Sequence, residues 1–223
     1  MYPTVKSEFS GHDTRVPVEP LTPERRRQLT RSALVDAAIE VFAKKGFDGS
    51  SLEEIAETAG FTRGAIYSNF GSKEDLMLAV VERYNETLVG SFSDTLERAA
   101  DISQEEMTVS AAALWRDLIR RDPNLTALNL EFRVRALRDP AFRARFLELQ
   151  HENDKHIAEL IEREAKTYGI AMKYEAADLA QILNAATVGI SELAGIDVEH
   201  AERYDRLIEM FFRMIGESMA GSS

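Results

Sequence analysis

The chain has 223 residues, of which 44% are hydrophobic and 29% are charged, a composition typical of a soluble globular protein. It contains no cysteine, which excludes disulfides and thiolate metal sites, and it has neither a signal-peptide core nor a run of about 18 apolar residues that would span a membrane. We therefore expect a cytoplasmic protein, and its net charge of −11 at first argues against a nucleic-acid partner.

The charge is unevenly distributed along the chain. Residues 21–85 carry 9 Lys and Arg against 10 Asp and Glu, whereas the remaining residues carry 18 against 28. Besides Arg83, the basic residues of the near-neutral segment are Arg25, Arg26, Arg27, Arg31, Lys44, Lys45, Arg63 and Lys73. Because the acidity belongs mostly to the C-terminal part, the whole-chain charge does not exclude DNA.

The first 85 residues predict a flexible arm followed by three short helices and a longer one. Residues 1–20 contain three prolines and show no apolar periodicity. Thr22 is a predicted N-cap, Ser51 begins a capping box, and Thr62 is a predicted N-cap for the third helix. Glycines end the segments, so the helices are expected within residues 23–46, 52–59 and 62–70 and from 73 onward.

The remainder is also predicted to be helical. Ser103 and Glu106 form a second capping box, and two Asp-Pro pairs restart helices near residues 123 and 140. Further helices are expected at about 174–195 and 198–219, and no segment shows strand alternation. The prediction is an all-α protein of about nine helices, with an arm (1–20), a helix-turn-helix domain (21–72) and a larger helical domain (73–223).

Two interpretations of the first three helices are open at this point. A short connection between the second and third helices is typical of a helix-turn-helix that places its last helix in the DNA major groove. A small helical bundle whose glycines only end helices is the alternative. The segment FTRGAIYSNF favours the first interpretation, because it combines a small-residue start with a polar and aromatic end.

The motifs AAIEVFAKKGF and SSLEEIAETAGFTRGAIYSNFGSKEDL, in this order and spacing, strongly resemble the DNA-binding domain of the tetracycline-repressor (TetR) family of bacterial regulators. The resemblance covers about fifty residues, roughly a quarter of the chain. It implies that residues 62–70 enter the major groove of DNA. For the C-terminal part, only the helical layout is similar, which implies a ligand-binding and dimerisation domain without naming the ligand.

The residues predicted to contact DNA lie on or beside this third helix. Gly64 and Ala65 remove side-chain bulk where the helix would approach the duplex, and the polar groups can bind phosphates or base edges. Each has an alternative, since Gly64 could allow close helix packing and Ser51 and Thr62 would act as caps without DNA. The full set is Ser51, Thr62, Arg63, Gly64, Ala65, Tyr67, Ser68, Asn69 and Lys73.

The C-terminal domain is predicted to hold a small-molecule effector in an apolar cavity with a few polar groups. Buried polar side chains there either bond locally or contact a ligand, and both interpretations stay open. The candidate ligand-binding residues are Trp115, Phe132, Phe146, Asn153, Asn184 and Thr187.

The last two helices resemble the pair that forms an intermolecular four-helix bundle in the family, which implies a homodimer. The alternative for their apolar residues is an ordinary intramolecular core. The predicted interface residues are Leu183, Ile190, Leu207, Phe211, Phe212 and Ile215.

The resemblance therefore implies a ligand-responsive regulator, by default a repressor that binds palindromic operator DNA as a homodimer. No catalytic motif, metal-ligand cluster or cofactor motif is present, so we expect neither an enzyme, a metal site nor a cofactor. The alternatives are a helical protein-interaction module and a small-molecule enzyme.

Overall fold

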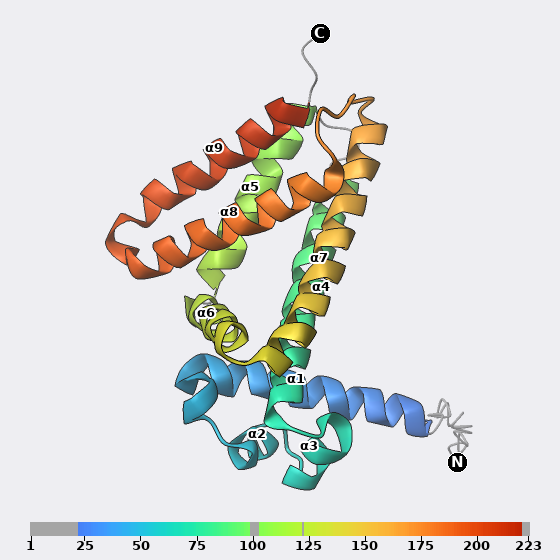
Figure 1. Cartoon of the computed structure of the whole chain (residues 1–223), viewed down its shortest axis with the longest axis vertical. Helices are drawn as coiled ribbons and strands as arrows, with labels where there is room; N and C mark the ends of the chain where they lie inside the picture. Colours follow the sequence, from blue (N-terminus) through green and yellow to red (C-terminus); the bar gives the residue numbers. More distant parts are fainter. Residues whose placement is uncertain (1–21, 99–102, 122, 220–223) are drawn as a thin grey trace, which may run out of the picture.

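The protein was analysed as a computed structural model that describes residues 22–98, 103–121 and 123–219. Over these residues it is all-α, as predicted, with nine α-helices, one short 3-10 helix and no strand (Figure 1). The predicted arm of residues 1–20 lies outside the described residues. The helices are α1 (Pro23–Gly49), α2 (Leu52–Thr58), α3 (Arg63–Phe70), α4 (Lys73–Arg98), α5 (Gln104–Arg121), α6 (Pro123–Arg138), α7 (Pro140–Thr167), α8 (Ala176–Ile196) and α9 (Ala201–Met219), with η1 (Val198–His200) before α9.

Most of the predicted helix starts are confirmed by hydrogen bonds from the capping side chains. Thr22 Oγ1 accepts the Arg25 N–H at 3.2 Å, and Ser51 Oγ accepts the Glu54 N–H at 3.1 Å. Ser103 and Glu106 bond each other's backbone N–H groups, which makes a complete capping box. The prediction that Thr62 caps α3 is wrong in one respect: it occupies the N-cap position, but its hydroxyl makes no capping hydrogen bond.

The helices α1, α2 and α3 surround a core that continues into the rest of the molecule. Phe42, Ile55 and Ile66 are almost fully buried at its centre. The same cluster includes residues 76–81 of α4, together with Phe132 of α6 and apolar residues of α7. The N-terminal helices thus do not have a core of their own, because their core extends across residue 72, where the sequence analysis placed the domain boundary, into α4, α6 and α7.

The C-terminal helices form the upper part of the molecule. Helices α4 and α7 run side by side away from α1; α5 packs against α4, α8 packs against α7, and α9 packs against α5 and α8 (Figure 1). Trp115, Ile208 and Phe212 form a second buried cluster. By length and composition alone, α8 is apolar enough to cross a membrane; in this structure it packs against α7 and α9.

A polar contact fixes α6 to the end of α1. Gly46 has φ of +72°, a conformation that favours glycine, and it kinks α1 immediately before the Phe47 N–H. The Glu131 carboxylate on α6 accepts that N–H at 2.6 Å. A Cβ on residue 46 would lie 2.7 Å from Glu131 Oε1, so both the φ angle and the contact require glycine.

Two ion pairs reinforce this junction. Arg135 on α6 binds Glu74 at 2.9 Å and stacks over the Phe47 ring, while Arg145 on α7 pairs with Asp75. Both acidic partners lie in the first turn of α4, where negative charge also suits the helix dipole. The start of α4 is therefore held by charges from α6 and α7.

We predict that Glu131→Ala destabilises the protein, because it leaves the buried Phe47 N–H without a partner. The expected loss is about 1–2 kcal/mol, or about 3–6 °C in Tm for a chain of this size, measured by thermal unfolding. Glu148→Ala, an exposed glutamate on α7, is the matched control and should leave Tm unchanged. Equal Tm values for the two variants would contradict the role assigned to Glu131.

Candidate nucleic-acid interface and internal cavity

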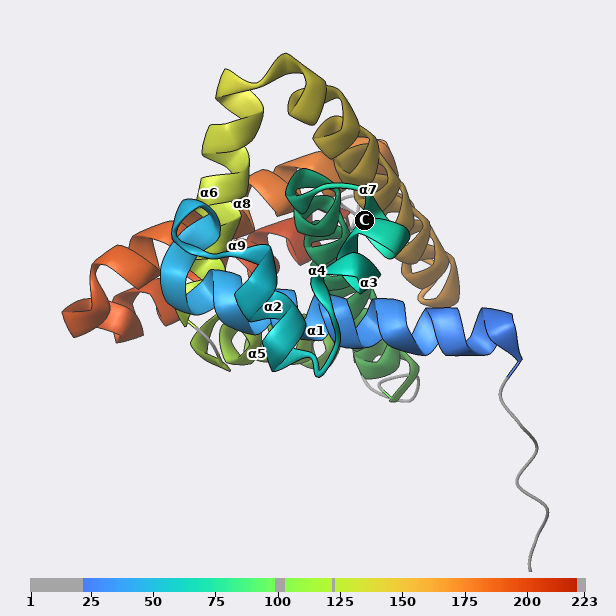
Figure 2. The ribbon, with the colours of Figure 1, turned by 90° about the horizontal axis from the view of Figure 1, so that it is seen from below.

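Helix α3 forms an exposed polar surface at one end of the molecule. In the view from below, α2 and α3 lie on the near side, not covered by the C-terminal helices (Figure 2). Ile66 is the buried residue that holds α3 to the core. The predicted DNA contacts that are exposed here are Ser51, Thr62, Arg63, Gly64, Tyr67 and Ser68.

No contact among the described residues requires glycine at position 64. A Cβ built there would meet only Thr62 Oγ1, at an ordinary van der Waals distance of 3.6 Å. The interpretation that Gly64 allows close helix packing is therefore wrong. Ala65, the next residue, is half-buried against the core. The start of α3 thus presents backbone and very little side chain to the outside.

Arg63 is held along the exposed side of α3 by two neighbours. Its guanidinium donates to the Tyr67 hydroxyl at 2.7 Å and pairs with Glu53 of α2. The hydrogen bond with Tyr67, together with the Glu53 charge, raises the pKa of Arg63, so the side chain stays positively charged. The arrangement keeps one cation and one hydroxyl at the surface of α3 in a fixed orientation.

The side chains of Asn69 and Lys73, which the sequence analysis predicted as DNA contacts, both make hydrogen bonds within the protein. The Asn69 amide donates to the Ala65 carbonyl at 2.8 Å, within its own helix. Lys73 donates to the Ser50 carbonyl at 2.6 Å and to the Phe47 carbonyl, and burial lowers the pKa of its ammonium group. Lys73 thus holds the segment between α1 and α2 against α4, and a phosphate contact by either residue remains a prediction.

Arg31 also has an internal role that the sequence analysis did not detect. It donates to the Asn69 carbonyl at 3.2 Å, and its guanidinium lies 4.4 Å from the centre of the Phe70 ring. Both contacts are at the C-terminal end of α3. Arg31 therefore fixes the orientation of α3 relative to α1, whereas Arg25, Arg26 and Arg27 are exposed.

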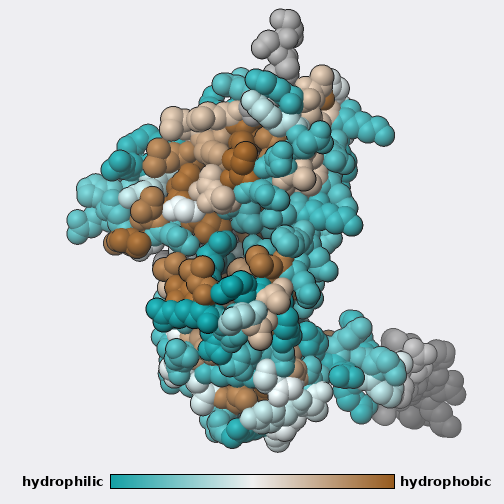
Figure 3. All heavy atoms as spheres, viewed as in Figure 1, coloured by the Kyte–Doolittle hydropathy of each residue, from teal (hydrophilic) through white to brown (hydrophobic). Residues whose placement is uncertain are grey.

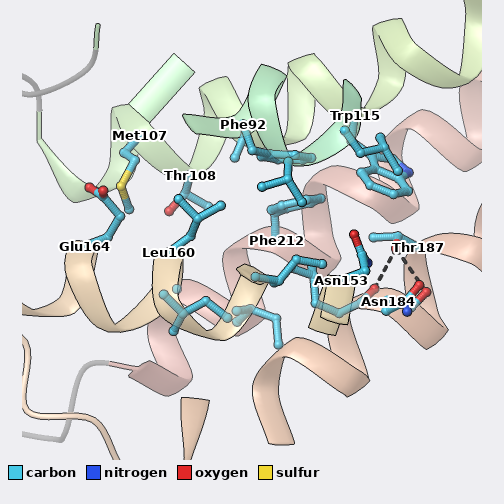
Figure 4. Close-up of a pocket in the computed structure, with 18 residues that line it drawn as sticks. Phe92, Met107, Thr108, Trp115, Asn153, Leu160, Glu164, Asn184, Thr187 and Phe212 are labelled. Atoms are coloured by element: carbon cyan, nitrogen blue, oxygen red, sulfur yellow. Dashed lines mark hydrogen bonds between the residues drawn. The ribbon is translucent and has the colours of Figure 1, made fainter. Parts of the chain in front are cut away.

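The C-terminal domain contains an apolar cavity of about 140 Å³ between α4, α5, α7, α8 and α9 (Figure 4). Trp115, Asn153, Asn184 and Thr187 line it, as predicted for a ligand site. Phe132 and Phe146 do not line it. They belong to the core shared with the N-terminal helices, because α6 and the start of α7 pack toward α1 rather than toward α5.

The polar groups at one end of this cavity are mostly satisfied within the protein. The Thr187 hydroxyl donates to the Leu183 carbonyl at 2.6 Å, and Trp115 Nε1 donates to Ser191 Oγ at 3.3 Å. Asn184 donates to Asp154 at 2.9 Å. Asn153 is the exception: it is 6% exposed, and its Oδ1 atom is buried without a hydrogen-bond partner among the described residues.

The predicted dimer-interface residues lie deeper than expected. Phe212, Leu183 and Ile215 line the cavity, while Ile190 and Phe211 pack against the cluster around Trp115 and Ile208. Leu207 is half-buried. The apolar residues of α8 and α9 that are exposed instead are Ile182, Leu193, Ile196, Met210 and Met214.

A sequence model of a family described as bacterial regulatory proteins, tetR family, matches residues 34–80, the segment from the middle of α1 into α4. The chain is also similar to the HTH-type transcriptional repressor AcnR of Corynebacterium diphtheriae, with 28% identity over 85% of this chain and 95% of AcnR. The chain thus carries the DNA-binding sequence of the TetR family of transcriptional regulators and is similar to a repressor beyond it. The HTH-type relatives are transcriptional regulators and not enzymes. Within the described residues, no cluster of three or more His, Cys, Asp or Glu is placed to hold a metal ion.

Other relatives match over a shorter part of the chain. The HTH-type transcriptional regulator TtgR of Pseudomonas putida is 40% identical over 35% of each chain, so the match spans about a third of that relative. Solved structures agree in fold over most of the chain. They include a putative TetR-family regulator from Rhodococcus sp. (TM-score 0.69, 19% identity, 84% of this chain and 98% of the other). Another is FadR from Bacillus subtilis in complex with stearoyl-CoA (TM-score 0.62, 18% identity, 86% and 99%).

We predict that Gly64→Ala is neutral or raises stability by up to about 1 kcal/mol, because the added methyl makes only an ordinary van der Waals contact and alanine favours a helix. Thermal unfolding measures the change. Gly71→Ala is the matched comparison, since Gly71 ends the same helix with φ of +85°; alanine there should cost about 1–2 kcal/mol. A clear loss of Tm in Gly64→Ala would show that the glycine serves the fold.

Proposed function

We propose that this protein is a cytoplasmic TetR-family repressor that binds palindromic operator DNA as a homodimer and is released by a small molecule bound in the C-terminal cavity. The observation that carries the proposal is Gly64. This glycine stands exposed at the start of α3, and no contact in the part of the chain that the structure describes requires it. A close approach by an outside partner is the physical reason that remains.

The surface around Gly64 suits a DNA duplex. A helix that lies in the major groove presents its N-terminal residues to base edges, while neighbouring groups bind phosphates. Arg63 supplies a charged donor, and Tyr67, Ser68 and Thr62 supply exposed hydroxyls on the same helix or at its start. Ser51 is the N-cap residue of the preceding helix, α2. These residues are the contacts we propose.

A dimer is needed because a single module of this kind buries only about 600–1,000 Å² on DNA. Two copies of α3 about 34–36 Å apart reach successive turns of one face of the duplex, which corresponds to an inverted repeat. The α8–α9 surface supports a two-fold interface, since apolar residues gather over these helices (Figure 3). We define this dimer surface as Ile182, Leu193, Met210 and Met214, each more than half exposed in the single chain.

Control by a small molecule is supported by the cavity and by one structural neighbour, and repression is supported by the name of one relative. The structure of FadR from Bacillus subtilis holds stearoyl-CoA, and AcnR is named a repressor. In this chain, Leu88, Val89 and Phe92 of α4 line the cavity, and the first turns of the same helix lie in the core beneath α3. A ligand that favours one position of α4 would shift the population of DNA-binding conformations.

The first prediction concerns DNA affinity. Gly64→Leu should weaken binding to a duplex selected from random sequences by at least about tenfold, because the side chain separates α3 from the groove. Gly90→Leu on α4 is the matched control: Gly90 is also exposed, with no atom within 4 Å of a built Cβ. Fluorescence anisotropy at fixed salt measures both, and equal affinities for the two folded variants would contradict the proposal.

The second prediction concerns the dimer. Replacing both Met210 and Met214 by glutamate should give a monomer, because two dimer-related charge clusters would be buried without partners. Sedimentation analysis measures the mass, and DNA affinity should fall with it. Leu137→Glu, a substitution of an even more exposed apolar residue on α6, should stay dimeric. A double variant that remains dimeric would refute the α8–α9 interface, and an unchanged DNA affinity in a monomer would refute the need for two copies.

A further inference from the structure

We propose that the effector bound in the cavity is a small, uncharged, mainly apolar molecule that carries one hydroxyl group, such as an alkylphenol, and that this hydroxyl bonds Asn153. The inference rests on the proposed function and deepens it by naming the class of ligand. It comes from three properties of the cavity: its size, its charge and the unpaired amide of Asn153.

The size of the cavity sets the size of the ligand. An apolar cavity of about 150 Å³ holds a molecule of the size of benzene. The cavity measured here, about 140 Å³, therefore suits one ring with a short alkyl substituent. Its walls favour such a ligand, because Phe92, Trp115 and Phe212 lie close together along one side (Figure 4).

The charges around the cavity argue against an anion. No Lys, Arg or His is found among the described residues that line it, so a carboxylate or phosphate would be buried without a counter-charge. Glu164 lies at the end opposite Asn153, where its negative charge opposes an anion further (Figure 4). Its carboxylate already has Arg163 as a partner at 3.2 Å, so it does not require a cationic ligand.

Asn153 supplies the polar contact. It is more than nine-tenths buried and lies in the cavity wall beside Thr187, with an Oδ1 atom that no described group of the protein satisfies (Figure 4). An unpaired buried amide is costly, whereas Thr187, Asn184 and Trp115 are bonded within the protein. A hydroxyl both donates and accepts, so it complements the amide in either orientation. Asn153 is therefore the group that distinguishes a phenol from a hydrocarbon of the same shape.

The test uses four probes of nearly equal size: 4-ethylphenol, ethylbenzene, 4-ethylbenzoate and 4-ethylbenzylamine. Trp115 is the only tryptophan of the chain and lines the cavity, so its fluorescence reports binding directly and without DNA. We expect 4-ethylphenol to bind about tenfold more tightly than ethylbenzene, equivalent to about 1.4 kcal/mol, and the two charged probes to bind more weakly than both. Tighter binding of the benzoate or the benzylamine would overturn the inference.

A variant assigns the preference to Asn153. In Asn153→Leu the advantage of the phenol should disappear while ethylbenzene still binds, and Tm should hold or rise because an unpaired amide has been removed. Asn129→Leu, the same change on α6 outside this cavity, should keep the tenfold preference. A phenol preference that survives in Asn153→Leu would overturn the assignment. The comparison of probes on the natural chain needs no variant and decides the ligand class even if Asn153→Leu fails to fold.

Different experimental results would refute the proposed regulation by a ligand and the proposed class of ligand. If 4-ethylphenol binds at Trp115 as expected but leaves the affinity for duplex DNA unchanged, ligand control of DNA binding is refuted and the ligand class stands. If a charged probe binds best and releases DNA, the ligand class is refuted and the regulator stands.

Discussion

The arrangement of the molecule depends on one constraint: the DNA-binding helices share their core with the C-terminal domain. Leu76 and Met77 of α4 are fully buried beneath α3, and Phe132 of α6 belongs to the same cluster. A helix-turn-helix of three short helices buries too little apolar surface to be independent of its neighbours. Because α4, α6 and α7 complete the core, the position of α3 is linked to the packing of the C-terminal helices.

The shared core links the C-terminal cavity to α3, the helix that we propose binds DNA. Helix α4 is continuous from the core beneath α3 to the cavity wall at Val89, a distance of about 18 Å from Met77 at the rise of an α-helix. The polar junction acts at the same place, since Glu131 holds the end of α1 and Arg135 holds the start of α4. A shift of α4 relative to α6 has to break or move these contacts, and packed cores of this kind change between discrete arrangements.

The sequence predicted most of the fold because its helix boundaries are marked locally. Caps, prolines and glycines act over three or four residues, and their hydrogen bonds are present at Thr22, Ser51, Ser103 and Asp139. The spacing of the glycines and the small residues at the start of α3 are likewise signals that can be read from a few neighbouring residues. This is why the exposed position of Gly64 was predictable without any knowledge of the tertiary structure.

The side-chain directions were less predictable where a helix has partners on several sides. Phe211 and Phe212 are adjacent apolar residues, and periodicity alone does not show that Phe212 fills the cavity while Met210 is exposed. Phe146 lies on a long amphipathic helix whose first turns face the N-terminal core and whose middle faces the cavity. Lys73 was predicted as a DNA contact and Arg31 was recognised only as a basic residue, because the carbonyls that both side chains bind come from distant segments.

The central claim is that two copies of α3 are held at a fixed separation that DNA favours and the ligand disfavours. Because the chain has no cysteine, Thr58→Cys at the exposed end of α2 gives one spin-label site in each copy, and pulsed electron spin resonance measures the distance between them. We expect one narrow distance with a selected duplex and a shifted distribution with 4-ethylphenol. The absence of any intermolecular distance, or the same distribution in every state, would contradict the account.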